Sequence, residues 1–379
     1  MSHPFPALFL FAAAVLTVAG CSQESSAAVY PTADFRPPGL VAAGPSDSHS
    51  VLVRFDEAVT PVPDSFSCEP RSTLSCRTED KDLIVSFVAD QSPGADYALV
   101  GEVDDLRGNR ARFLLRFVGW NDRAPRMRLS EVQTGKNSSK SNPHRDYIEF
   151  EVLADGNAGG EEVSWTSTVK TSTYRFPGLE LHAGDFIVLH LAPEGVDAEL
   201  NELGADLSVS DGVDASVTGR DLWCATAPLP DESGAVSLSL RPGSPPYEGF
   251  FYSDDAKSGA LSDDRLAAML STLSTAGVWP VAGAKAAWED GFRWNSSPAK
   301  SICRSGTPAG PASWYVTATG GQTPGAPNMS PEASLAAKAI AKASLKASAK
   351  ANAIAKVSSK VITKPAAKRA PRKAAVKKP

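Results

Sequence analysis

The sequence predicts an all-β protein: two Ig-like β-sandwich domains in series, a partly helical insertion in the second, and a disordered tail rich in lysine and alanine. Three observations predict this class. Short runs of alternating apolar and polar residues recur along the chain, 29 glycines and 29 prolines supply turns between them, and the body holds one convincing helical pattern. Short strands separated by frequent turns are typical of β-sandwiches.

Changes in composition divide the 379 residues into successive segments. In chain order we expect a signal peptide at 1–20, a Ser/Pro/Ala-rich tether at 21–44, a first sandwich at 45–121, a second at 125–328 with an insertion at about 195–300, and a basic tail at 329–379.

The N-terminal segment has the pattern of an export signal. An apolar run at 8–18 is too short to span a bilayer and is followed by small residues. The stretch V-A-G-C ending at Cys21 resembles the lipobox of bacterial lipoproteins, in which the cysteine becomes the new N-terminus and carries acyl chains such as palmitate. The resemblance implies lipidation of Cys21 and a membrane-anchored lipoprotein of the cell envelope, facing the periplasm or the cell surface. An ordinary signal cut nearby is the alternative, because no Lys or Arg precedes the apolar run.

Four further cysteines are candidates for disulfide bonds: Cys68, Cys76, Cys224 and Cys303. An even number in an exported protein favours disulfides, and four cysteines allow three connectivities. Proximity in the sequence favours Cys68 with Cys76 and Cys224 with Cys303. Free thiols are the alternative if the compartment is not oxidising.

The first sandwich is predicted from four alternating runs and one turn. The strands are expected at 51–55, 83–87, 97–103 and 112–118, with a Gly-Asn hairpin turn at 108–109. The stretches "VLVRFDEAV" and "SPGADYALVGEVDDLRGNRARFLLRFVG" resemble the Ig-like domain of bacterial surface-layer and adhesin-type proteins. That resemblance implies a spacer or support fold without catalytic residues.

The second sandwich is predicted from strands around 125–133, 146–152 and 179–191 and from late strands near 302 and 314. In the run D-Y-I-E-F-E-V, Ile148, Phe150 and Val152 share one face, and the polar residues share the other. The pieces "LSEV", "DYIEF", "LHAGDFIVL", "SICR" and "WYVTATGGQTPGAPN" resemble the lamin-tail domain, an Ig-type sandwich. This resemblance implies a binding or scaffold module.

About half of the second segment exceeds the ~100 residues of a plain Ig sandwich and is therefore expected to be an insertion. It holds the helical pattern: Ser262 as cap, Asp263 and Asp264 in the first turn, and Gly277 after the end. The apolar face comprises Leu266, Met269, Leu270 and Leu273. We expect the nearby aromatic residues to pack the insertion onto the sandwich; a binding groove is the alternative.

No motif in the sequence carries recognisable chemistry. "QTGKNSS" fails the phosphate-loop pattern, and no G-x-S-x-G or H-E-x-x-H occurs. We therefore expect no catalytic residues, no metal site and no cofactor. The alternative is a hydrolase, because bacterial lamin-tail domains often accompany secreted nucleases or phosphoesterases and the segment 195–300 could hold a site.

The tail is strongly basic, although the chain as a whole is acidic. From Pro331 onward it carries thirteen Lys or Arg and one acid, so its net charge is +12 within a chain of net charge −5. Lysines four residues apart would repel one another on a helix, and prolines near the end disfavour one. The residues expected to bind a polyanion are Lys338, Lys342, Lys346, Lys350, Lys356, Lys360, Lys364, Lys368, Arg369, Arg372 and Lys373.

Together these patterns predict a lipid-anchored envelope protein with a structural, adhesive or binding role. Its expected partners are membrane lipid through acylated Cys21, a protein ligand, and an anionic envelope polymer, lipid or extracellular nucleic acid through the tail. The alternatives are part of a secreted nuclease or phosphoesterase, a non-specific nucleic-acid binder, and a solvated tail without a partner. The oligomeric state stays open.

Overall fold

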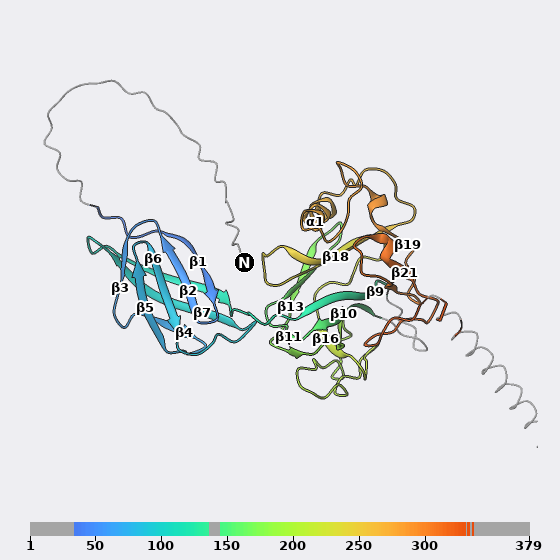
Figure 1. Cartoon of the computed structure of the whole chain (residues 1–379), viewed down its shortest axis with the longest axis horizontal. Coiled ribbons are helices and arrows are strands. Elements are labelled where there is room, and N and C mark those ends of the chain that lie inside the picture. Colours follow the sequence, from blue (N-terminus) through green and yellow to red (C-terminus); the bar gives the residue numbers. More distant parts are fainter. Residues whose placement is uncertain (1–33, 136–144, 331, 334–335, 337–379) are drawn as a thin grey trace, which may run out of the picture.

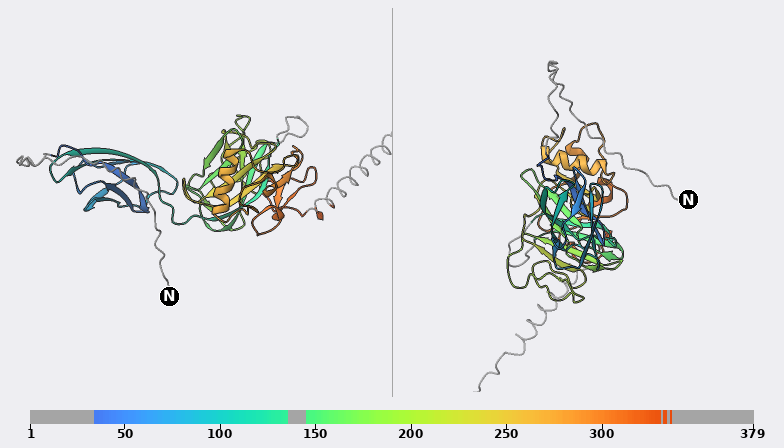
Figure 2. Two further views of the ribbon diagram at one scale, coloured as in Figure 1. Left: turned by 90° about the horizontal axis from the view of Figure 1, so that it is seen from above. Right: turned by 90° about the vertical axis from the view of Figure 1, so that its left-hand side faces the viewer.

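The computed structural model describes residues 34–135 and 145–330, together with residues 332, 333 and 336. The strands form two groups that lie end to end, each around its own hydrophobic core (Figures 1 and 2). We call them the first unit, residues 34–121, and the second unit, residues 125–330. The prediction of an all-β, sandwich-like protein is confirmed. Cys21 and the eleven basic residues expected to bind a polyanion lie outside the described residues.

The first unit is built from two facing sheets. One has the order β1-β2-β6-β5, made of β1 (Leu40–Asp47), β2 (Ser50–Phe55), β6 (Asp82–Phe87) and β5 (Leu74–Glu79). In the other, β7 (Asp96–Asp105) pairs along one side with β3 (Val59–Pro61) and β4 (Ser67–Glu69) and along the other with β8 (Arg110–Val118).

Period-two alternation explains this core. Val51, Val53 and Phe55 are buried on β2, as predicted, and their neighbours are less buried. The four predicted strands correspond to β2, β6, β7 and β8, and Gly108 adopts a φ of 87° in the turn between the last two. These expectations are confirmed.

The second unit contains a six-stranded and a five-stranded sheet. The six-stranded sheet runs in the order β16 (Arg220–Cys224), β15 (Phe186–Leu191), β10 (Asp146–Ala154), β9 (Arg126–Gln133), β20 (Ile302–Arg304) and β21 (Trp314–Val316). The five-stranded sheet runs in the order β13 (Thr171–Arg175), β12 (Glu162–Thr166), β17 (Gly234–Ser239), β18 (Pro246–Asp254) and β19 (Phe292–Trp294). A short pair, β11 (Gly156–Asn157) with β14 (Glu180–Leu181), and two 3₁₀ turns, η1 (Trp288–Asp290) and η2 (Pro311–Ser313), complete it.

The expected insertion at 195–300 is partly wrong, because β16, β17, β18 and β19 all come from it and belong to the two sheets. The sandwich itself is larger than a plain Ig domain. The aromatic residues of this stretch do pack into its core, as predicted: Phe250, Phe251, Tyr252, Trp279, Trp288 and Trp294 are buried.

The helix α1 (Asp264–Thr275) packs against β12, β17 and β18 through Leu266, Leu270 and Leu273. Its cap is Asp263, whose carboxylate accepts the Leu266 N–H at 2.9 Å, so the expected capping by Ser262 is wrong by one residue. Among the described residues, no helix has the length and apolar character needed to cross a bilayer.

All four body cysteines are free thiols, which corrects the expected disulfides. Cys224 and Cys303 lie on β16 and β20, with β15, β10 and β9 between them. Four strand spacings amount to about 19 Å, whereas the Cα atoms of a disulfide are at most about 7 Å apart. Cys68 and Cys76 lie on strands of different sheets, β4 and β5, and neither is bonded.

The two units meet through closely packed backbone. A Cβ on Gly94 would lie 2.6 Å from the Gly160 nitrogen, and one on Gly159 would lie 2.4 Å from the Pro93 oxygen. Real Cβ contacts are essentially never this short, so only glycine allows this approach.

Polar contacts add to the junction. The Asn121 amide, which lies between the units, donates to the carbonyl oxygens of Asn157 (2.6 Å) and Gly159 (2.9 Å). Arg175 of β13 forms an ion pair with Asp96 of β7 at 2.8 Å. Backbone packing and these contacts therefore specify how one unit sits on the other.

Candidate functional site

The central strand β10 has two buried faces. Ile148, Phe150 and Val152 point into the sandwich core, as the alternation predicts. Tyr147 and Glu149 alternate with them and lie on the opposite face, yet both are fully buried as well. Other parts of the chain must therefore exclude water from this second face.

Polar residues of the neighbouring strands align with these two side chains. Glu149 lies opposite Glu131 of β9, and Tyr147 lies between Gln133 of β9 and His190 of β15. We call these five residues the polar cluster; each is 0% exposed. Buried titratable groups gathered in one place are a common mark of a functional site, so the cluster is the first candidate.

The chain segment 317–328, which we call the closing loop, is tied to the two glutamates of the cluster. The Thr323 N–H donates to Glu131 Oε2 at 3.1 Å, and the Gly325 N–H donates to Glu149 Oε2 at 2.7 Å. Each carboxylate thus satisfies a backbone donor that burial would otherwise leave unpaired.

The T-P-G-x-x-N motif explains why this loop fits. Gly325 has a φ of 74°, and a Cβ there would lie 2.0 Å from Ser216 Oγ. The Asn328 amide donates to the Ser130 carbonyl oxygen at 3.0 Å, which anchors the end of the loop on β9. The motif is therefore used for docking onto the sheet.

Burial dominates the electrostatics of the glutamate pair. It raises the pKa of Glu131, and donors such as Ser301 and Thr323 oppose this shift. Burial, followed by the charge of Glu131, raises the pKa of Glu149 well above its usual range. The pair resists holding two negative charges at once, because the charges would be close together and poorly solvated.

A buried histidine–aspartate pair continues the polar face toward β16. His190 Nε2 lies 2.8 Å from Asp221 Oδ1, both residues are 0% exposed, and the Trp223 ring stacks on the imidazole at 4.0 Å. The other oxygen of Asp221 accepts the Ser216 N–H at 2.8 Å. No hydroxyl or thiol among the described residues hydrogen-bonds to His190, and its Nδ1 has no partner there. Asp221 therefore links the imidazole of His190 to the backbone at Ser216.

Cys303 of β20 lies opposite Glu131 in the same sheet. Burial, and then the charge of Glu131, raise the pKa of the Cys303 thiol. Since the thiolate is the reactive form, this cysteine is held in its unreactive state.

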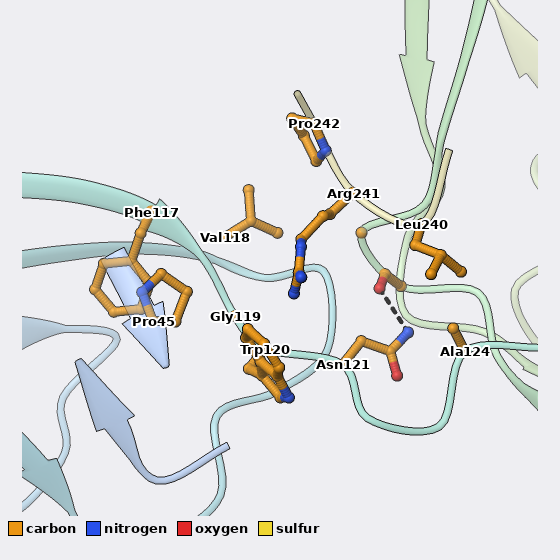
Figure 3. A pocket seen from close by; sticks show the side chains of 12 residues that line it. Pro45, Phe117, Val118, Gly119, Trp120, Asn121, Ala124, Leu240, Arg241 and Pro242 are labelled. Atoms are coloured by element: carbon orange, nitrogen blue, oxygen red, sulfur yellow. Dashed lines mark hydrogen bonds between the residues drawn. The ribbon is translucent and has the colours of Figure 1, made fainter. Parts of the chain in front are cut away.

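An open pocket of about 480 Å³ lies beside the junction of the two units and is the second candidate (Figure 3). Its volume falls in the range of small-molecule sites, and boundaries between domains are common places for them. From the first unit it is lined by Pro45, Phe117 and Trp120, and from the second by Leu240, Arg241 and Pro242.

One group of acids has the spacing of metal ligands. Oxygen atoms of Asp34, Glu57 and Asp105 lie within 4.8 Å of one another in the first unit. The carboxylate of Asp105 already accepts the N–H groups of Arg107 and Asn109 at 2.7 and 2.8 Å. The geometry of Asp105 is therefore explained by the β7–β8 turn.

The polar cluster was not predicted from the sequence. Tyr147 and Glu149 alternate with core residues, a pattern that normally places them in water. The available signal was the combination of L-S-E-V, D-Y-I-E-F and T-P-G-x-x-N, which together supply Glu131, Glu149 and the closing loop. The residues around the pocket had no signal, because they come from separate strands, turns and connections of both units.

A family described as "protein second domain" matches residues 125–319, just over half of the 379 residues. This range covers nearly all of the second unit.

An uncharacterized protein of Treponema pallidum (strain Nichols) is 27% identical over 147 residues, which are 38% of this chain and 36% of that protein. The chain therefore matches about a third of the length of this relative. Among solved structures, two of L,D-transpeptidase 3 from Mycobacterium tuberculosis, one with a faropenem-derived adduct, are 13% identical with a TM-score of 0.13. They cover 49% of this chain and 89% and 90% of those chains, and at this TM-score the likeness supports no argument.

Proposed function

This chain belongs to the protein family described as "protein second domain", and from this premise we propose that it is a scaffold and binding protein of the cell envelope. In this proposal the two β-sandwich units stand in series. A lipid anchor at Cys21 holds one end near a membrane, and the basic tail contacts an anionic polymer or surface at the other.

The fixed junction is the observation that carries the proposal. Gly94 and Gly159 allow direct backbone contact, and the Asn121 amide joins the units through two hydrogen bonds. Two domains joined by a flexible linker would move independently, whereas a fixed junction transmits position and load. A spacer or scaffold needs that property.

The chemistry of the polar cluster supports the same role. Glu131 and Glu149 accept backbone N–H groups of the closing loop, and the thiol of Cys303 is held in its neutral form. Carboxylates engaged in this way stabilise a fold, which favours a structural role for the cluster over the hydrolase alternative.

The sequence supports the two attachments. The motif V-A-G-C at Cys21 resembles a lipobox, and the tail has a net charge of +12. Basic residues near an anionic surface contribute about 1 kcal/mol each. The lamin-tail resemblance of the second unit is also consistent with a binding module.

Small-angle X-ray scattering of the full chain tests the junction. The expected profile is that of two units in one fixed arrangement. Gly159→Val, which places a side chain against the Pro93 carbonyl, should broaden the distance distribution, and Gly44→Val, at a glycine with open space around it, should not. If the unaltered protein already scatters as two independent bodies, the scaffold proposal loses its main support.

Labelling of cells with a radioactive fatty acid tests the anchor. The unaltered chain should take up label and sediment with membranes, whereas Cys21→Ala should lose the label and become soluble. Equal membrane retention of both proteins would reject anchoring through Cys21.

A further inference from the structure

The pocket beside the junction has the form of a small-molecule site. Its volume is about 480 Å³, and its walls come from both units. Figure 3 shows the Arg241 side chain extending from the β17–β18 turn toward Trp120, with Phe117 and Val118 on one side and Leu240 on the other. A ligand placed there would touch both sandwiches at once.

Most of the lining is apolar. Phe117, Val118 and Trp120 form the wall of the first unit, and Leu240, with 48% of its surface exposed, forms part of the other. Covering such surface with an apolar group releases water and favours binding. The Asn121 amide offers little to a ligand, since it already donates to two carbonyl oxygens.

Arg241 is the cation of the pocket. Its guanidinium lies 4.4 Å from the centre of the Trp120 ring, and no carboxylate among the described residues forms an ion pair with it. Some other arginines, including Arg54 and Arg123, have such partners, whereas others in the described residues, such as the exposed Arg112, do not. A guanidinium without a carboxylate partner, beside apolar walls, is suited to binding an anion.

From this arrangement we propose that the pocket binds a small amphiphile that has an apolar body and one carboxylate. The apolar body packs against Trp120 and Leu240, and the carboxylate takes a two-pronged hydrogen bond from Arg241. One guanidinium balances one negative charge, which favours a carboxylate over a phosphate monoester with nearly two.

Binding of this kind would also strengthen the junction. The apolar body would contact Phe117 and Trp120 of the first unit while its carboxylate is held by Arg241 of the second. A ligand that binds only the joined arrangement stabilises it by mass action.

Isothermal titration calorimetry with decanoate, below its micelle concentration, tests the inference. The full chain carrying Cys21→Ala is used throughout, so that no acyl chain of the protein competes. We expect one saturable decanoate site, no binding of acetate, which lacks the apolar body, and at least tenfold weaker binding of decyltrimethylammonium, whose charge is reversed.

Arg241→Gln should weaken decanoate binding about tenfold, because it removes a charge-assisted hydrogen bond. Leu240→Asp, which adds a negative charge at an exposed position, should abolish it, and Arg112→Gln, an exposed arginine away from the pocket, should leave it unchanged. Circular dichroism confirms folding of each variant. The inference is overturned if decanoate shows no saturable site, if Arg241→Gln binds as tightly as Arg112→Gln, or if the cationic amphiphile binds equally well.

Discussion

Glu131 and Glu149 lie opposite each other on β9 and β10, and each accepts a backbone N–H from the same loop, at 3.1 Å from Thr323 and at 2.7 Å from Gly325. Two like-charged residues at adjacent positions would destabilise an exposed sheet. Here they fasten a loop that lies nearly 200 residues later in the sequence than β9. The closing loop thus covers the polar face of the six-stranded sheet in the second unit.

Glu149→Ala should lower the free energy of unfolding of the second unit by about 2–4 kcal/mol, since it leaves a cavity and an unpaired Gly325 N–H. Glu149→Gln keeps an acceptor oxygen for the Gly325 N–H and carries no charge, so its free energy of unfolding should stay within about 1 kcal/mol of that of the unaltered protein. Urea unfolding followed by tryptophan fluorescence measures both. Equal losses from the two variants would contradict the hydrogen-bonding role.

Gly325→Ala should destabilise the second unit by about 2 kcal/mol or more, because its φ is 74° and the new Cβ would meet Ser216 Oγ at 2.0 Å. Gly320→Ala is the matched control in the same loop: its φ is 72°, but there is open space around it. This substitution should lower the free energy of unfolding by about 1 kcal/mol, because alanine is strained at a positive φ and the new Cβ meets no neighbour. Thermal unfolding separates the two, and equal costs would show that contact with Ser216 is unimportant.

Glu161 should make the second unit less stable as the pH rises. Burial raises its pKa to about 8, while the Tyr247 hydroxyl donates to it at 2.5 Å. The folded state therefore binds more protons than the unfolded state between pH 4.5 and about 8. Below this range the free energy of unfolding keeps the whole contribution of Glu161. As the pH rises through the range, the free energy of unfolding falls, by at most about 1.4 kcal/mol per pH unit.

Glu161→Gln cannot ionise, so its stability relative to the unaltered protein should rise from pH 5 to pH 8. Urea midpoints and slopes at several pH values give this difference. Glu69→Gln, at an exposed position, is the control variant, and a flat difference for Glu161→Gln would contradict the raised pKa of Glu161.

Asp263→Ala should cost about 1 kcal/mol, because the Asp263 carboxylate caps α1 by accepting the Leu266 N–H. Ser262→Ala should lower the free energy of unfolding by no more than a few tenths of a kcal/mol, because its side chain does not cap the helix. Chemical unfolding of both variants decides which residue is the cap, and a larger loss at Ser262 would favour the assignment made from the sequence.

Many elements of the fold were predictable because the conformation of a strand, turn or helix depends on residues that are close together in the sequence. Val51, Val53 and Phe55 alternate with more polar residues, so a strand with one apolar face follows from side-chain direction alone. Gly108 occupies a turn that needs a positive φ, and Leu266, Leu270 and Leu273 recur at helical spacing. Each of these signals lies within a few neighbouring residues.

The candidate sites were not predictable in this way, because each depends on segments far apart in the chain. Glu149 lies at a position that the alternation of β10 assigns to solvent. It is buried because the loop containing Gly325, 176 residues later in the chain, packs over it. Arg241 and Trp120 come from turns of different units and meet at the junction. Cys224 and Cys303 are neighbours in the order of the cysteines along the chain, but three strands separate them in the sheet.

By itself, therefore, the sequence determined the all-β class, fewer than half of the strands, the helix and the basic tail, since hydrophobic period and turn chemistry act over short distances. Only the tertiary structure decided which polar residues are buried, which cysteines could meet and where a pocket opens. Those outcomes depend on strand order and on the packing of Gly94 against Gly160, and long-range packing leaves no local period in the sequence.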